Sequence, residues 1–93
     1  MPQNALTITD KDEQFAMIRM IVAEELELDL SELEDDKDFV DAYEADSLSL
    51  IQVFARIERE LHVSVPQEEM NKMVDVLTTL EIVSRYAGGA TDV

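Results

Sequence analysis

Residues 46–61 read DSLSLIQVFARIEREL. Apolar side chains recur in this stretch at intervals of three and four residues, which is the spacing that places side chains on one face of a helix. Asp46 is a favoured N-cap residue, because its carboxylate accepts hydrogen bonds from the free backbone N–H groups of a first helical turn. We therefore expect a helix that begins at Asp46 and Ser47 and ends near Glu60 or Leu61. Its core face is the full-length apolar stripe, which comprises Leu50, Val53, Phe54, Ile57 and Leu61.

Similar patterns on either side of this stretch predict three further helices. Upstream, Thr9 or Asp10 can cap a helix, Asp10 and Glu13 have the spacing of a capping box, and the apolar repeat that follows predicts a helix over 10–26. Downstream, Pro66 suits a first helical position and predicts a short helix over about 66–72. Asp75 is expected to cap a last helix that runs through Tyr86 and is ended by two glycines. The apolar residues of the first and last of these helices are Phe15, Ile18, Ile21, Val22 and Leu26, and Val76, Leu80 and Val83.

The segment between the first two long helices, residues 27–46, is rich in acids and lacks a helical repeat. We expect a long ordered loop that is anchored to the core by Leu28, Leu33, Phe39 and Val40. The predicted fold is therefore all-α: a small four-helix bundle of three main helices and one short helix, with this loop between the first and second helices. The bundle spans residues 10–87, and residues 1–9 and 88–93 are expected to be flexible tails.

The composition excludes several classes of function. The chain has 93 residues, with 22 acids against seven bases and a net charge of -15. Such a protein repels nucleic acid and anionic lipid and attracts basic surfaces on partner proteins, and we expect a monomer. It has no cysteine, which removes disulfides and thiolate catalysis. Because neither a signal peptide nor a membrane-spanning stretch is recognisable, we expect a cytoplasmic protein that does not enter membranes.

The segment from Glu44 to Leu50 resembles the phosphopantetheine attachment site of acyl carrier proteins, whose core is Asp-Ser-Leu at the start of the second helix. Upstream, Phe39-Val40 lies where that family has an apolar pair, and downstream Val65-Pro66 resembles its Ile-Pro before the third helix. The resemblance covers roughly residues 10–87. Two positions differ: Glu44 replaces a common glycine and Tyr43 replaces a usual leucine.

This resemblance implies a carrier rather than an enzyme, with no catalytic residue and no metal site. It implies that Ser47, flanked by Asp46 and Leu48, receives 4'-phosphopantetheine from coenzyme A and carries acyl groups as thioesters. The free N–H groups at a helix start favour a phosphodiester at this position. The implied partners are a phosphopantetheinyl transferase and then an acyltransferase, a ketosynthase or acyl- or aminoacyl-activating enzymes.

A second, shorter apolar stripe on the same helix lies beside Ser47 and consists of Leu48, Ile51 and Ala55. Further core is one interpretation of this stripe, but we favour an exposed docking surface because a partner must reach the arm at Ser47. Polar and basic residues on the same side, Gln52, Arg56 and Arg59, complete the expected partner surface. Carriers of fatty-acid synthesis tend to place acids there, so the two arginines favour a carrier of polyketide or other specialised metabolism.

Other functions remain alternatives at this stage. They are a peptidyl or aminoacyl carrier on the same fold, a carrier for fatty-acid synthesis, and an acidic helical interaction module without modification. A serine hydrolase is disfavoured, because the only histidine, His62, lies more than three helical turns from Ser47. The acidic loop does not fit a calcium-binding EF-hand either. If Asp36 is the first residue of such a loop, Asp41 is the sixth, where glycine is needed, and Ser47 is the twelfth, where glutamate is needed.

The charge predicts that salt and divalent cations stabilise the fold. Acids are densest over residues 24–46, so their mutual repulsion falls when counterions screen or bind them. Thermal melts with added magnesium and with sodium chloride at matched ionic strength check this. Midpoints that do not move in either series would contradict it.

Overall fold

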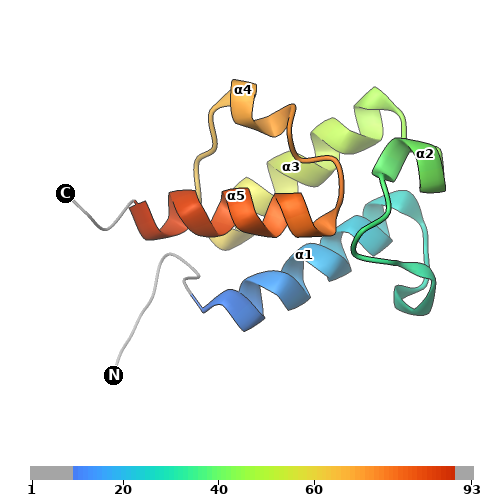
Figure 1. The fold of residues 1–93 in the computed structure, drawn as a ribbon, viewed down its shortest axis with the longest axis horizontal. Coiled ribbons are helices and arrows are strands. Elements are labelled where there is room, and N and C mark those ends of the chain that lie inside the picture. The colour runs from blue at the N-terminus through green and yellow to red at the C-terminus, as the bar shows by residue number, and fades with distance from the viewer. Residues whose placement is uncertain (1–9, 90–93) are drawn as a thin grey trace.

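The computed structural model describes residues 10–89, and these residues form an all-helical fold without a β-strand. Three long helices make up the bundle: α1 (Lys11–Leu26), α3 (Ser47–Leu61) and α5 (Val76–Gly89). Two short helices, α2 (Phe39–Tyr43) and α4 (Gln67–Met70), and the 3₁₀ turn η1 (Leu30–Glu32) lie between them. In Figure 1, α4 lies on the side of the bundle away from α1, and α2 lies at the end of the bundle where α3 begins. The predicted all-α bundle with three main helices is confirmed.

An aspartate side chain caps four of these helices, because each carboxylate accepts a hydrogen bond from a free N–H group of the first turn. Asp46 and Asp75 are the predicted caps, Asp10 is one of the two candidates for the first helix, and Asp38 begins α2. The N-to-O distances are 2.9 Å from Asp12 to Asp10, 2.8 Å from Val40 to Asp38, 2.9 Å from Ser49 to Asp46 and 2.8 Å from Thr78 to Asp75.

The expected long loop contains helical structure, which corrects the prediction. Both η1 and α2 lie inside residues 27–46. Neither is long enough to show a repeat of apolar residues, so the sequence pattern does not reveal them. Leu33 and Phe39 are buried as predicted and Leu28 is partly buried against the core, but Val40 is 51% exposed and does not anchor the loop.

The predicted ends of the last two helices also need correction. Pro66 is the residue before α4 and has an extended backbone, with ψ of 147°, so the helix itself begins at Gln67. Helix α5 continues through Gly88 and Gly89 instead of ending before them. Glycine in a helix costs about 1 kcal/mol relative to alanine, which does not stop a helix that already has three turns. Of the expected tails over 1–9 and 88–93, residues 1–9 and 90–93 lie outside the described residues.

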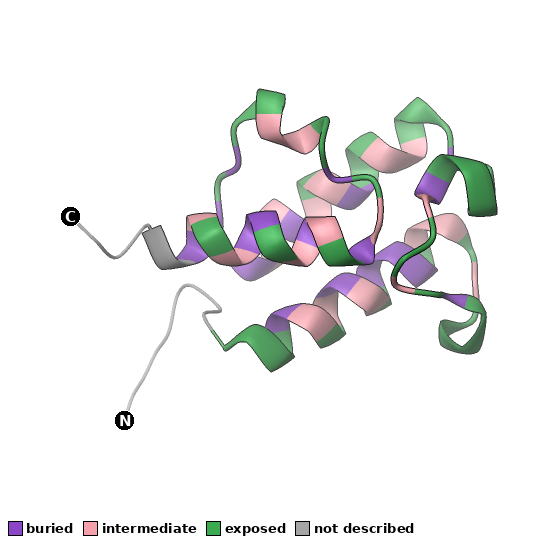
Figure 2. Cartoon of the chain, viewed as in Figure 1, coloured by how far each residue is buried: buried purple, intermediate pink, exposed green. Residues whose placement is uncertain are grey.

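The core lies where α1 packs against both α3 and α5. Figure 2 shows the buried positions of the three long helices along their facing sides. Of the stripe predicted on α3, Val53, Ile57 and Leu61 are fully buried, whereas Leu50 and Phe54 are only partly buried. Phe39 from α2 is the largest fully buried side chain, so the short helix contributes to the same core.

Arg56 links α3 to α1 through ion pairs. Its guanidinium lies 3.0 Å from Glu24 Oε1, 3.0 Å from Glu25 Oε2 and 2.9 Å from Glu60 Oε2. Hydrogen bonds to these carboxylates, that of Glu60 first, raise the pKa of Arg56 above its ordinary value. Arg56 was predicted to belong to the partner surface, and in the structure its side chain is 20% exposed and paired with three glutamates within the bundle.

We predict that Arg56→Met lowers the free energy of unfolding by about 1–2 kcal/mol, because three carboxylates then lose their shared cation. The matched control is Arg59→Met, since Arg59 is exposed on the same helix; its effect should stay within about 0.5 kcal/mol. Urea unfolding of both variants at low salt measures the difference. Equal losses in the two variants would show that Arg56 does not fasten the helices.

Candidate functional site

Ser47 is the first residue of α3 and is exposed. The preceding residue, Asp46, is extended, and its carboxylate caps the helix through the Ser49 amide. Within the described part of the chain, no hydrogen bond uses the Ser47 hydroxyl. The cap and the exposed hydroxyl therefore belong to two different side chains, as the sequence predicted.

The charge of Asp46 is stabilised by the helix that it caps. Hydrogen bonds from the backbone N–H and then the side chain of Ser49 hold the pKa of Asp46 below its ordinary value. Asp46 therefore remains an ionised cap over the whole neutral range. The remaining free N–H groups of the first turn lie beside Ser47, where they favour a negatively charged substituent.

The two residues that differ from the usual carrier pattern both have a structural role. Glu44 has φ of 57° and ψ of 34°, a left-handed conformation that favours glycine. It ends α2, and its N–H bonds to the carbonyl of Val40 at 3.0 Å. The Tyr43 hydroxyl bonds to the backbone of Glu34, accepting from its N–H at 2.7 Å and donating to its carbonyl at 3.3 Å. Tyr43 thus fixes α2 against the preceding loop.

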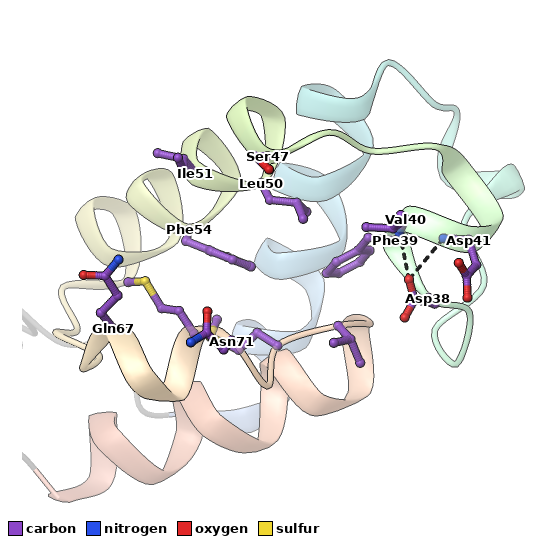
Figure 3. A pocket seen from close by; sticks show the side chains of 13 residues that line it. Asp38, Phe39, Val40, Asp41, Ser47, Leu50, Ile51, Phe54, Gln67 and Asn71 are labelled. Carbon is purple, nitrogen blue, oxygen red and sulfur yellow. Dashed lines mark hydrogen bonds between the residues drawn. The ribbon is translucent and has the colours of Figure 1, made fainter.

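A cavity of about 490 Å³ opens beside Ser47, between α2, α3, α4 and the turn before α5. Figure 3 shows Leu50 and Phe54 pointing from α3 into this space, with Phe39 on the α2 side and Gln67 and Asn71 on the α4 side. The wall is mainly apolar, and polar groups lie on several of the lining segments. Its remaining lining residues are Asp38, Val40, Asp41, Ser47, Ile51, Met70, Met73 and Val74.

The shorter stripe of α3 lies on the surface, as predicted. Leu48 is 64% exposed and Ile51 is 62% exposed, and Ala55 is exposed one turn further along. Gln52 and Arg59 are exposed as well. This face of α3 adjoins the cavity, since Ile51 also lines the cavity.

Comparison with known proteins agrees with this geometry. The family model described as phosphopantetheine attachment site matches residues 17–86, which include Ser47 and every wall of the cavity. The chain belongs to the acyl carrier protein family. It is similar to polyketide-8 synthase acyl carrier protein 2 of Streptomyces avermitilis, with 31% identity over 88 residues that cover 95% of this chain and 97% of the relative.

This carrier protein has 4'-phosphopantetheine as its covalently bound prosthetic group, tethers acyl intermediates on it and has no catalytic activity of its own. The described residues fit such a group, because an exposed hydroxyl at a helix start adjoins a mainly apolar cavity. When bound, the group supplies the thiol that forms the thioester, which the chain cannot supply because it has no cysteine. None of the described helices is long and apolar enough to cross a membrane.

The sequence indicated Asp46, Ser47 and Leu48, and the structure places them together at the start of α3. The sequence did not indicate the cavity. Its walls come from segments that are far apart in the chain, and residues such as Met70 and Met73 carry no local sign of a shared cavity. The left-handed backbone at Glu44 was partly indicated by the sequence, because carriers commonly have glycine at this position.

We predict that Glu44→Gly raises the free energy of unfolding by about 0.5–1 kcal/mol, because glycine adopts the left-handed conformation without the Cβ clash. Glu44→Ala is the matched control: it removes the same charge but keeps a Cβ. Thermal and urea unfolding of the two variants separate backbone strain from charge. Equal stabilisation by alanine would attribute the effect to charge alone.

Proposed function

We propose that Ser47 is the residue to which the phosphopantetheine arm is attached. The observation that carries this proposal is the separation of roles at the start of α3, where Asp46 caps the helix and the Ser47 hydroxyl stays exposed and unbonded. Ser49, two residues further on, is less suited because its amide is bonded to Asp46 and its side chain also contributes to that interaction. Leu48 flanks the site with an exposed apolar surface.

Attachment requires the Ser47 hydroxyl to attack the phosphate of coenzyme A that bears the pantetheine. A bond forms between Ser47 Oγ and phosphorus, the pyrophosphate bond of coenzyme A breaks, and the adenosine bisphosphate leaves. The hydroxyl proton passes to a base of the transferase; the histidine of this chain, His62, lies at the far end of α3. The chain contributes the nucleophile and holds it at a helix start that favours the new phosphodiester.

We further propose that the carrier works in polyketide assembly in the cytoplasm, with an acyltransferase and a ketosynthase as partners. The similarity to a carrier of a polyketide synthase supports this pathway. A peptidyl carrier and a carrier of fatty-acid synthesis are less favoured, because no observation on the chain points to either.

The surface of α3 next to Ser47 is the proposed docking face for these enzymes. We define it by Leu48, Ile51, Gln52, Ala55 and Arg59, all of which are exposed. No carboxylate of the described residues forms an ion pair with Arg59, so its charge is available to an acidic group on a partner. Arg56, which is held by three glutamates, is not part of this face.

The first test is intact mass after incubation of the apo protein with coenzyme A and a broad-specificity phosphopantetheinyl transferase. We expect the wild type and Ser49→Ala to gain one phosphopantetheinyl group and Ser47→Ala to gain none. Ser49→Ala is the matched control, since the same hydroxyl is removed two residues away. No gain in the wild type, or an equal gain in Ser47→Ala, would contradict the proposal and favour an unmodified interaction module.

The second test compares the same substitution on two faces of α3. Ile57 is fully buried, so Ile57→Ala should cost about 2–5 kcal/mol of stability. Ile51 is 62% exposed, so Ile51→Ala should change stability by less than about 0.5 kcal/mol yet slow acyl transfer to or from a partner enzyme. Urea unfolding and transfer rates of both variants are measured. Wild-type transfer by Ile51→Ala would remove Ile51 from the docking face.

A further inference from the structure

A second exposed apolar surface lies where α2 meets the start of α5. Val40 is 51% exposed, Val74 is 42% exposed and Leu77 is 48% exposed. Two backbone hydrogen bonds bring their segments together: Phe39 N–H donates to the Val74 carbonyl at 2.8 Å, and Leu77 N–H donates to the Asp35 carbonyl at 3.2 Å. We call Val40, Val74 and Leu77 the α2–α5 patch.

The α2–α5 patch and the docking face of α3 share one cavity. Val40 and Val74 line it together with Ser47 and Ile51. In Figure 3, Val40 lies on the α2 side of this cavity and Ile51 lies on the α3 side. A partner that reaches into the cavity at Ser47 therefore meets exposed apolar side chains of this chain on more than one side of the cavity.

The negative charge around the α2–α5 patch limits which kind of partner can bind it. Residues 35–41 contain four aspartates and one lysine, in a chain whose net charge is -15. A second copy of the chain would bring like charges together, which disfavours a homodimer through this patch. A protein that offers apolar side chains flanked by lysine or arginine matches both the exposed apolar surface and the aspartates around it.

We propose that the α2–α5 patch is bound by the phosphopantetheinyl transferase itself, through an apolar surface with a basic rim; this inference rests on the proposed attachment at Ser47. Later enzymes are reached through the flexible arm, but the transferase acts before the arm exists and must bring its active site directly to Ser47. A standard interface buries about 800 Å² on each partner, which is a disc of about 16 Å radius. Because Val40 and Val74 line the same cavity as Ser47, an interface of that size centred on Ser47 includes the cavity mouth and both valines as well as the near part of the docking face.

The test measures the kinetics of phosphopantetheine loading with saturating coenzyme A and a broad-specificity transferase. The double variant Val74→Ser/Leu77→Ser should raise the KM for the carrier about fivefold or more and leave kcat unchanged, because it weakens docking and not the chemistry. The matched control is Met20→Ser. Met20 is 39% exposed on α1, a helix that does not line the cavity, so its KM should equal that of the wild type.

The outcomes separate this inference from the proposed function. A wild type that gains no phosphopantetheine overturns both, whereas a wild type that loads normally with an unchanged KM in the double variant overturns the patch alone. If the double variant does not fold, Val40→Ser decides: a raised KM supports the patch and an unchanged KM overturns it. Sedimentation equilibrium of the wild type gives a further check, because a dimer that the double variant abolishes would make a second copy the occupant and overturn the proposal.

Discussion

The hydrogen bond from the Ser49 amide to the Asp46 carboxylate fixes where α3 begins, and most of the site depends on that position. Because the cap is Asp46, the next residue, Ser47, enters the helix with its hydroxyl exposed. The same starting point directs Val53 and Ile57 into the core and leaves Ile51 on the surface. A helix that began one residue later would use the Ser47 hydroxyl as its cap and remove the nucleophile from solvent.

The few cations of the chain have specific positions in this acidic fold. Arg19 pairs with Asp35 and contacts the Leu30 carbonyl, so it holds the loop after α1, and Arg56 joins α1 to α3. Arg59 is the exception on α3, since it is exposed at the docking face. The arrangement leaves Asp38 and Asp41 at the cavity beside Ser47 and Arg59 as the exposed cation of α3. A partner that covers both therefore needs basic groups near Ser47 and an acidic group further along α3.

The parts of the fold that the sequence predicted are those encoded locally. Asp10, Asp46 and Asp75 each precede an apolar repeat, and each begins a long helix. Short elements were missed because a helix of five residues, such as α2, shows no repeat. The ion pairs that Arg56 forms with α1 were missed for another reason. The two partners on α1 lie 31 and 32 residues away in the sequence, and only packing brings them to Arg56. The cavity beside Ser47 is likewise a product of tertiary structure.

The central claim is that an ionised Asp46 caps α3 and thereby leaves Ser47 free to be modified. Its pKa is lowered in the fold, so its contribution to stability is present above the ordinary value and is lost as pH falls through the folded value. The most direct test is an NMR titration of the Asp46 carboxyl carbon together with the Ser49 amide. We predict one shared midpoint below 3.8, the ordinary value for aspartate. An ordinary midpoint for Asp46, with a Ser49 amide that does not respond to pH, would contradict the account.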